Sequence, residues 1–160
     1  MPFSQGLVYV AADALFPNSR FILSQRPADK WFTSMCDFHK RAYKLEDLTK
    51  LTEKDIMEKF LYLYPGYTHS SKERLLSSFK GDTKRVMWEK LYDYEYYTSM
   101  YSQRNEEIKR YFMDAPHKLL SIDITREKTT ERICEFLNIP PELAIHMPSN
   151  NASTSVVSNL

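Results

Sequence analysis

The sequence predicts a helix-rich α/β fold around a small parallel sheet. Two short apolar segments, residues 20–25 and 119–124, have the length and composition of strands. The Phe-Ile-Leu run of the first segment is apolar on both faces, which suits the middle of a parallel sheet better than its edge. Two strands are few for such a sheet, because it needs cover on both faces. We therefore expect an exposed sheet edge or an apolar face.

The N-terminal half contains four predicted helices. An apolar run at residues 6–16 stops at Pro17-Asn18, and a second helix spans residues 28–39. Thr52-Glu-Lys-Asp55 resembles a capping box and starts a helix to Tyr64, stopped by Pro65-Gly66. Ser70 or Ser71 is expected to cap a short helix through Phe79, before Gly81-Asp82 breaks the chain.

The C-terminal half is predicted to contain one long helix over residues 83–113. Residues spaced alternately four and three apart form a stripe along it, namely Met87, Leu91, Tyr94, Thr98, Tyr101, Asn105, Ile108 and Phe112. The stripe indicates a helix that faces a core; a coiled coil is the alternative. Thr129 or Thr130 should cap a helix through Asn138, and Pro140-Pro141 opens a last short turn.

Size and composition indicate one globular domain, residues 1–148, followed by a Ser/Asn-rich flexible tail at 149–160. A net charge of +1 argues against a nucleic-acid partner. Eleven Tyr and nine Phe predict a thick aromatic core. Cys36 and Cys134 have apolar neighbours on predicted helices, so we expect two buried thiols rather than a disulfide.

Targeting and metal-binding signals are not visible in the sequence. No run of about 18 apolar residues would span a membrane. Met1-Pro-Phe-Ser is not the basic start of a signal peptide, so the sequence favours a cytoplasmic location. The four histidines are scattered, and no cluster has metal-ligand spacing.

The segment from Arg20 to Ser34 is the strongest functional signal. It reads as a strand, a polar turn with Arg26, and a helix start with Trp31 and Ser34. This arrangement is where α/β proteins bind phosphates, because the carboxyl end of a strand meets free helix N–H groups. Arg26 supplies a forked cation and Ser34 a hydroxyl. The alternatives are a surface arginine and an ordinary helix serine. Trp31 should pack the turn against the sheet.

Several segments, in this order, resemble the sulfotransferase family. Each motif alone is weak, but their order along nearly the whole chain makes the combined signal specific. The segments are Phe16-Pro17 before the Arg20-Phe-Ile-Leu strand and Arg26, Asn105 to Phe112 before Pro116-His-Lys-Leu-Leu, Glu131-Arg-Ile-Cys-Glu-Phe-Leu-Asn-Ile-Pro140, and Met147-Pro-Ser-Asn150.

The resemblance implies a fold like that of P-loop NTPases and transfer of a sulfuryl group from 3′-phosphoadenosine 5′-phosphosulfate (PAPS) to a hydroxyl or amine. By position, Arg26 and Ser34 would bind the 3′-phosphate of PAPS or of its product, PAP. A small molecule, a glycan or a protein would be the acceptor. A cluster of Lys72, Arg74, Lys80, Lys84 and Arg85 would either meet an acidic acceptor or form a solvated face.

The sequence departs from the family at the loop that wraps the 5′-phosphosulfate. Only Gly6, Gly66 and Gly81 are present, and none follows a predicted strand. We therefore expect a sulfotransferase fold that is incomplete at the N-terminus, carries the 3′-phosphate-binding half and is inactive alone. No catalytic residue is assigned, although His69 is the best-placed histidine. The alternative function is a non-catalytic nucleotide-binding or assembly module, and an exposed sheet edge would allow self-association.

Overall fold

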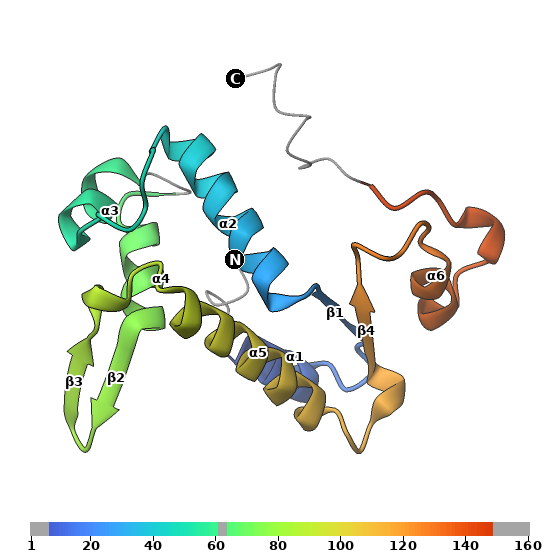
Figure 1. Ribbon diagram of the computed structural model, residues 1–160. Helices are drawn as coiled ribbons and strands as arrows, with labels where there is room; N and C mark the ends of the chain where they lie inside the picture. Colours follow the sequence, from blue (N-terminus) through green and yellow to red (C-terminus); the bar gives the residue numbers. More distant parts are fainter. Residues whose placement is uncertain (1–6, 61–63, 149–160) are drawn as a thin grey trace. The chain divides into compact units, whose positions relative to one another are not determined.

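The computed structural model describes residues 7–60 and 64–148, which form two compact units (Figure 1). The first unit comprises Met1–Pro17 and Pro27–Ile108, and the second comprises Asn18–Arg26 and Lys109–Leu160. The expected tail at 149–160 lies outside the described residues, and a single domain over 1–148 stays a prediction. None of the helices in the described ranges has the length and apolar character to cross a membrane.

The first unit is mainly helical. Its helices are α1 (Val8–Leu15), α2 (Ala28–Tyr43), α3 (Glu53–Lys59), α4 (Tyr67–Leu76) and most of α5 (Tyr94–Tyr111). The helix expected at residues 28–39 therefore continues for about another turn. It ends at Lys44, which has a φ of 53° in the left-handed region.

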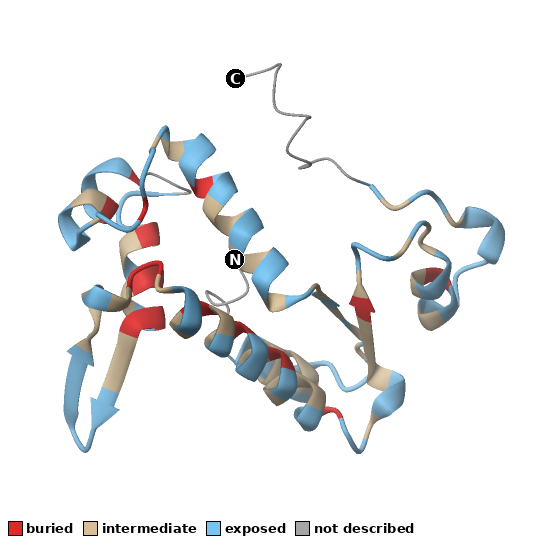
Figure 2. Ribbon diagram, in the orientation of Figure 1, coloured by how far each residue is buried: buried red, intermediate tan, exposed pale blue. Residues whose placement is uncertain are grey.

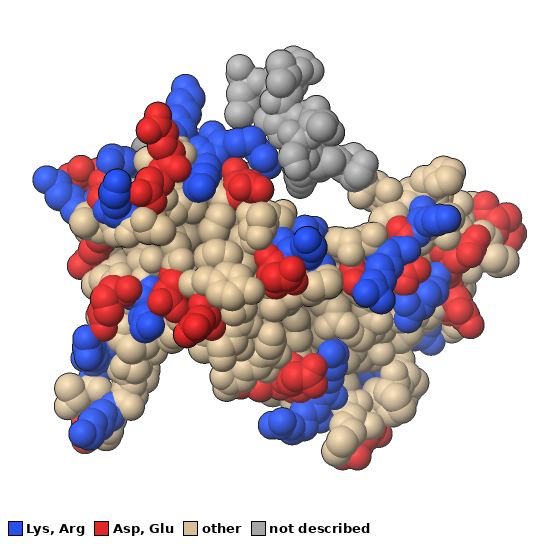
Figure 3. Space-filling view, viewed as in Figure 1, with Lys and Arg blue, Asp and Glu red and all other residues tan. Residues whose placement is uncertain are grey.

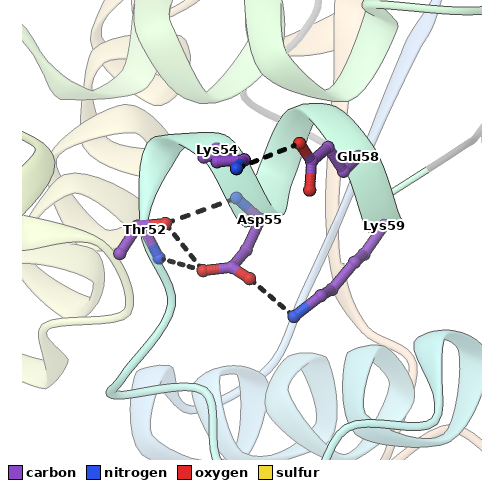
Figure 4. A network of polar contacts seen from close by, with 5 residues as sticks. All are labelled: Thr52, Lys54, Asp55, Glu58 and Lys59. Atoms are coloured by element: carbon purple, nitrogen blue, oxygen red, sulfur yellow. Dashed lines mark hydrogen bonds and ion pairs between the residues drawn. The ribbon is translucent and has the colours of Figure 1, made fainter.

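The capping box at the start of α3 is confirmed (Figure 4). The backbone N–H of Asp55 donates to the Thr52 hydroxyl at 3.4 Å, and the Thr52 N–H donates to Asp55 Oδ2 at 2.9 Å. Lys59 Nζ pairs with Asp55 Oδ1 at 2.6 Å. The helix ends at Lys59, earlier than the sequence suggested, and residues 61–63 lie outside the described part.

Helix α4 begins earlier than expected. Gly66, with a φ of 82°, occupies its N-cap position, so Ser70 and Ser71 lie inside the helix and do not cap it. The helix also ends at Leu76, because the next residues form strand β2 (Ser77–Lys80). Strand β2 pairs antiparallel with β3 (Thr83–Val86) across the Gly81-Asp82 turn, where Gly81 has a φ of 59°.

The single helix expected over residues 83–113 is therefore wrong in its first third. Strand β3 and a 3₁₀ turn, η2 (Trp88–Lys90), occupy that part, and Tyr92 has a left-handed φ of 58° that interrupts any helix. Helix α5 starts at Tyr94. The stripe holds only in part within α5: Tyr101 and Asn105 are buried, but Tyr94 is 52% exposed and the fully buried Tyr97 lies off the stripe.

Aromatic residues form much of the core of the first unit, as predicted. The buried residues of this cluster, red in Figure 2, are Leu48, Ile56, Phe60, Leu75, Leu76, Leu91, Tyr92 and Tyr97. Tyr97 and Leu76 are fully buried. Tyr92 and Tyr97 stack with ring centroids 5.7 Å apart, so rings fill space that aliphatic side chains fill in most cores.

The second unit contains the parallel sheet. Strand β1 (Phe21–Gln25) pairs in parallel with β4 (Leu119–Asp123), with Phe21 opposite Leu119 and Gln25 opposite Asp123. A 3₁₀ turn, η3 (Pro116–Lys118), precedes β4, and α6 (Glu131–Leu137) and η4 (Pro141–Leu143) follow it. The predicted fold class, helix-rich α/β with a small parallel sheet, is confirmed.

The position of β1 within the sheet differs from the expectation. Among the described residues β1 pairs with β4 alone, so it is an edge strand and not an interior one. Its burial alternates, and Ile22 is 42% exposed, whereas Phe21 packs on Phe112 at 4.8 Å. Because the exposed Ile22 is apolar like its neighbours, the Phe-Ile-Leu run wrongly indicated a strand that is buried on both faces.

Three local expectations, on a helix cap, on the two cysteines and on a proline-led turn, have different outcomes. Thr130 is the N-cap residue of α6, but its hydroxyl accepts the Ile145 N–H at 3.0 Å and does not cap the helix. Cys134 is buried and Cys36 is half-buried, and both thiols are free. The short turn opened by Pro140-Pro141 is present as η4.

Candidate functional site

Arg26 lies directly after β1, at the carboxyl end of the parallel sheet, as the sequence predicts. It is half-buried, so its guanidinium is partly shielded from water. Pro27 follows it as the N-cap residue of α2 and makes no side-chain cap. The first N–H groups of a helix have no intrahelical acceptor, so the start of α2 offers donors to an anion.

Ser34 lies in the second turn of α2 and is exposed. Its neighbour Thr33 uses its own hydroxyl to donate to the Asp29 carbonyl at 3.0 Å. Arg26 ends a segment of the second unit, and Ser34 belongs to the first. Binding of one phosphate by both residues stays a prediction.

Trp31 has a different partner from the one expected. Its ring stacks on Tyr101 of α5, with centroids 4.4 Å apart and planes 11° apart. The expectation that Trp31 packs the turn against the sheet is therefore incomplete: this ring joins two helices of the first unit. The stacking fixes the face that α2 turns toward α5.

The structure adds three residues at the end of β4 that the sequence reading missed. Asp123 Oδ1 accepts the Thr125 N–H at 3.0 Å and the Thr125 hydroxyl at 2.6 Å, and Arg126 Nε lies 3.5 Å from Oδ2. The Thr125 hydrogen bonds lower the pKa of Asp123, and the charges of Arg126 and Arg26 lower it further. Asp123 is therefore a carboxylate at neutral pH. Its signal was present as Asp-Ile-Thr-Arg, which begins at the last residue of a strand.

Two of the five cations in the basic cluster expected around Gly81 form ion pairs with glutamates. Lys84 pairs with Glu73 at 2.5 Å, and Arg85 pairs with Glu89 at 2.5 Å. Figure 3 shows acidic and basic side chains interspersed on the viewed face. Lys72 does not belong to this surface at all, because it is only 2% exposed.

Lys72 lies instead in the core of the first unit, among aromatic side chains. Its Nζ donates to Tyr97 Oη at 3.3 Å and lies 4.5 Å from the centre of the Tyr92 ring. Burial lowers the pKa of Lys72 to about 7. Burial also raises the pKa values of the Tyr92 and Tyr97 hydroxyls, so both stay protonated.

Two of the four histidines, His39 and His69, have structural partners. His39 is buried, and its Nδ1 is 2.9 Å from Tyr92 Oη; burial and the nearby Lys72 lower its pKa to about 3. His69 Nε2 pairs with Glu53 Oε1 at 2.8 Å and its ring lies against Trp88 at 5.3 Å, which ties α4 to α3. In the described ranges no group of three or more His, Cys, Asp or Glu side chains could hold a metal ion.

Comparison with known proteins identifies the family. A family model for the sulfotransferase domain matches residues 5–156, which is nearly the whole chain. No curated protein and no solved structure matches the chain. The match agrees with the order of segments in the sequence and with a strand that ends directly before Arg26 and is followed by a helix. The chain therefore belongs to the sulfotransferase family.

Proposed function

We propose that this protein binds PAPS and takes part in transfer of its sulfuryl group to a hydroxyl or amine. The observation that carries the proposal is the place of Arg26, half-buried where β1 ends in a parallel sheet. Ligands of open α/β sheets bind at the carboxyl ends of the strands. An arginine there matches a phosphate dianion, because its planar fork gives two parallel hydrogen bonds.

Arg26 and Ser34 are the proposed ligands of the 3′-phosphate. The guanidinium would provide the charge and the bidentate contact, and the hydroxyl would provide one short hydrogen bond. PAPS supplies the sulfuryl group. A bond forms from sulfur to the acceptor oxygen or nitrogen, and the bond from sulfur to the phosphate oxygen breaks. PAP leaves, and the proton of the acceptor is released to the solvent. The acceptor is the part of this reaction for which the described residues show no specific site.

A second candidate function is a nucleotide-binding or assembly module without catalysis. The glycines in the described part of the chain are Gly66, which caps α4, and Gly81, which forms the hairpin turn. Neither follows β1 or β4, so neither provides a loop that could wrap a phosphosulfate at the end of a strand. We propose accordingly that this chain carries the 3′-phosphate-binding half of the site.

Calorimetric titration with PAP tests the proposal. We expect binding that Arg26→Ala weakens by about 10-fold or more, because the variant removes a charge-assisted hydrogen bond. Arg41→Ala is the matched control: it removes the same charge from the exposed last turn of α2 and should leave binding unchanged. Absence of binding at millimolar PAP, or equal losses in both variants, would contradict the proposal.

Catalysis is tested separately, by mixing the protein with PAPS and a panel of hydroxyl and amine acceptors. Release of PAP with sulfation of an acceptor supports the enzyme. Tight PAP binding without release in any mixture supports the module.

A further inference from the structure

The carboxyl end of the sheet carries a second polar side chain beside the proposed phosphate ligand. Asp123 ends β4 and pairs with Gln25, the residue directly before Arg26. Because the two strands run parallel and in this register, both finish at the carboxyl end of the sheet, called the edge below. Arg26 and Asp123 belong to the same compact unit, and the charge of Arg26 contributes to the lowered pKa of Asp123.

The Asp123 carboxylate is held in one orientation and keeps accepting capacity. Its Oδ1 receives two hydrogen bonds from Thr125, and Arg126 Nε lies 3.5 Å from its Oδ2. An ionised carboxylate has about four lone-pair sites. The side chain is 22% exposed, so a ligand can reach it. The Asp123 carboxylate is thus an oriented and partly exposed acceptor of hydrogen bonds.

A 3′-phosphorylated ribose presents two neighbouring groups that need opposite kinds of hydrogen-bonding partner. Its 3′-phosphate is an anion that seeks a guanidinium, and its 2′-hydroxyl is a donor that seeks an acceptor. The edge offers this combination, with Arg26 after one strand and Asp123 at the end of the other. A carboxylate would repel a phosphate in the 2′ position, so the same residue would also exclude the isomeric nucleotide.

We propose that Asp123 accepts a hydrogen bond from the ribose 2′-hydroxyl of a nucleotide whose 3′-phosphate is bound by Arg26, and thereby selects 3′-phosphorylated nucleotides. This assignment rests on the proposed function. The edge keeps a net positive charge, since Arg26 and Arg126 outweigh one carboxylate, and so it still attracts a phosphate. Thr125 acts as a positioning residue, because its two hydrogen bonds orient the carboxylate.

Three ligands test the proposal on the unaltered protein: PAP, its 2′-deoxy analogue and adenosine 2′,5′-bisphosphate. We expect PAP to bind at least about 10-fold more tightly than the deoxy analogue, because the analogue lacks the hydrogen bond to a charged acceptor. The 2′,5′ isomer should bind more weakly still. Equal affinities for PAP and the deoxy analogue would overturn the assignment without any variant.

Variants of Asp123 then test whether this residue causes the difference in affinity between the ligands. Asp123→Ala should bring the affinities for PAP and the deoxy analogue to within about twofold of each other. Asp123→Asn keeps an acceptor for Thr125 and removes the charge, so it should fold normally and bind the 2′,5′ isomer more tightly than the parent protein does. Asp114→Ala, an exposed aspartate of the same unit, should change none of these ratios. An unchanged preference for PAP over the deoxy analogue in Asp123→Ala, or an unchanged affinity for the 2′,5′ isomer in Asp123→Asn, would overturn the proposal.

The two proposals fail differently. If neither PAP nor its deoxy analogue binds at millimolar concentration, the proposed function fails and the ribose assignment fails with it. If both bind, and Arg26→Ala weakens both, the function stands and only the ratio between the ligands decides the role of Asp123.

Discussion

The ammonium of Lys72 lies 4.5 Å from the centre of the Tyr92 ring, in the interior of the first unit. No ion pair joins it to a carboxylate of the described residues, and its one hydrogen bond goes to Tyr97 Oη. A charged amine is costly in such a place, and the faces of two aromatic rings offset only part of the cost. Protonation of Lys72 therefore opposes folding.

The first prediction concerns pH. The pKa of Lys72 in the folded protein is about 7, below its usual value of 10.5, so folding favours the neutral amine. The free energy of unfolding should rise as pH increases from 7 toward 10.5, by on the order of 3 kcal/mol between pH 7 and 9.5. Urea denaturation at both pH values measures this rise.

Lys72→Met is the control for that experiment, because it fills similar volume without an amine. We expect it to stabilise the protein at pH 7 by about 1–4 kcal/mol and to lose most of the rise. If the free energy of unfolding depends on pH in the same way in the parent protein and in Lys72→Met, the result would contradict the burial of a titrating lysine.

The second prediction concerns acid. The pKa of His39 is lowered from 6.5 to about 3 by burial, then by Lys72, so the folded state holds the neutral ring. Its contribution is complete above pH 6.5 and is lost as pH falls toward 3. The protein should therefore lose about 2–4 kcal/mol of stability over this range through His39.

His39→Phe should be less stable than the parent protein at pH 7, by about 1–3 kcal/mol, because the Tyr92 hydroxyl loses its partner. Its stability should also fall less steeply between pH 6.5 and 4. Thermal unfolding followed by circular dichroism at several pH values checks both statements. An equally steep fall in both proteins would show that other groups cause it.

The third prediction concerns the start of α3. Thr52→Ala should cost about 1 kcal/mol of stability, because the N–H of Asp55 loses its acceptor and the capping box opens. Thr52→Ser keeps the hydroxyl and should cost only a fraction of this. Chemical denaturation of the three proteins side by side gives the comparison, and equal stability of the Ala and Ser variants would speak against the cap.

The fourth prediction ranks the proposed phosphate ligands. Ser34→Ala should weaken PAP binding by about 3- to 10-fold, less than Arg26→Ala, because a neutral hydrogen bond contributes less than a charge-assisted one. Thr33→Ala is the matched control, since its hydroxyl already donates to the Asp29 carbonyl. Calorimetry on both variants decides the matter; a larger loss in Thr33→Ala would remove Ser34 from the site.

Local signals in the sequence predicted the elements that depend on them. The capping box at Thr52 and the strand before Arg26 are examples, because caps and short apolar runs act within a few residues. The hairpin at Gly81-Asp82 was missed, although a Gly-Asp pair between two short segments is a hairpin signal. Met87 and Leu91 happened to continue the helical spacing of α5, and that coincidence concealed the strand and the left-handed Tyr92.

Long-range relationships could not be predicted in the same way. The sequence placed Lys72 with four surface cations, since nothing local shows that two tyrosines some 20 residues later enclose it. Asp123 was likewise one acid among many until the register set it beside Gln25. The position of Arg26 was foreseeable, because strand, arginine and helix are consecutive in the chain.

The pairing of β1 with β4 has a consequence for biosynthesis. Strand β1 leaves the ribosome well before its hydrogen-bonding partner, because residues 26–118 are made between the two strands. At about 5–20 residues per second, the nascent β1 waits on the order of ten seconds for β4. During that interval its backbone donors and acceptors lack their native ladder, so translation speed and chaperone access should influence the yield of correctly assembled protein.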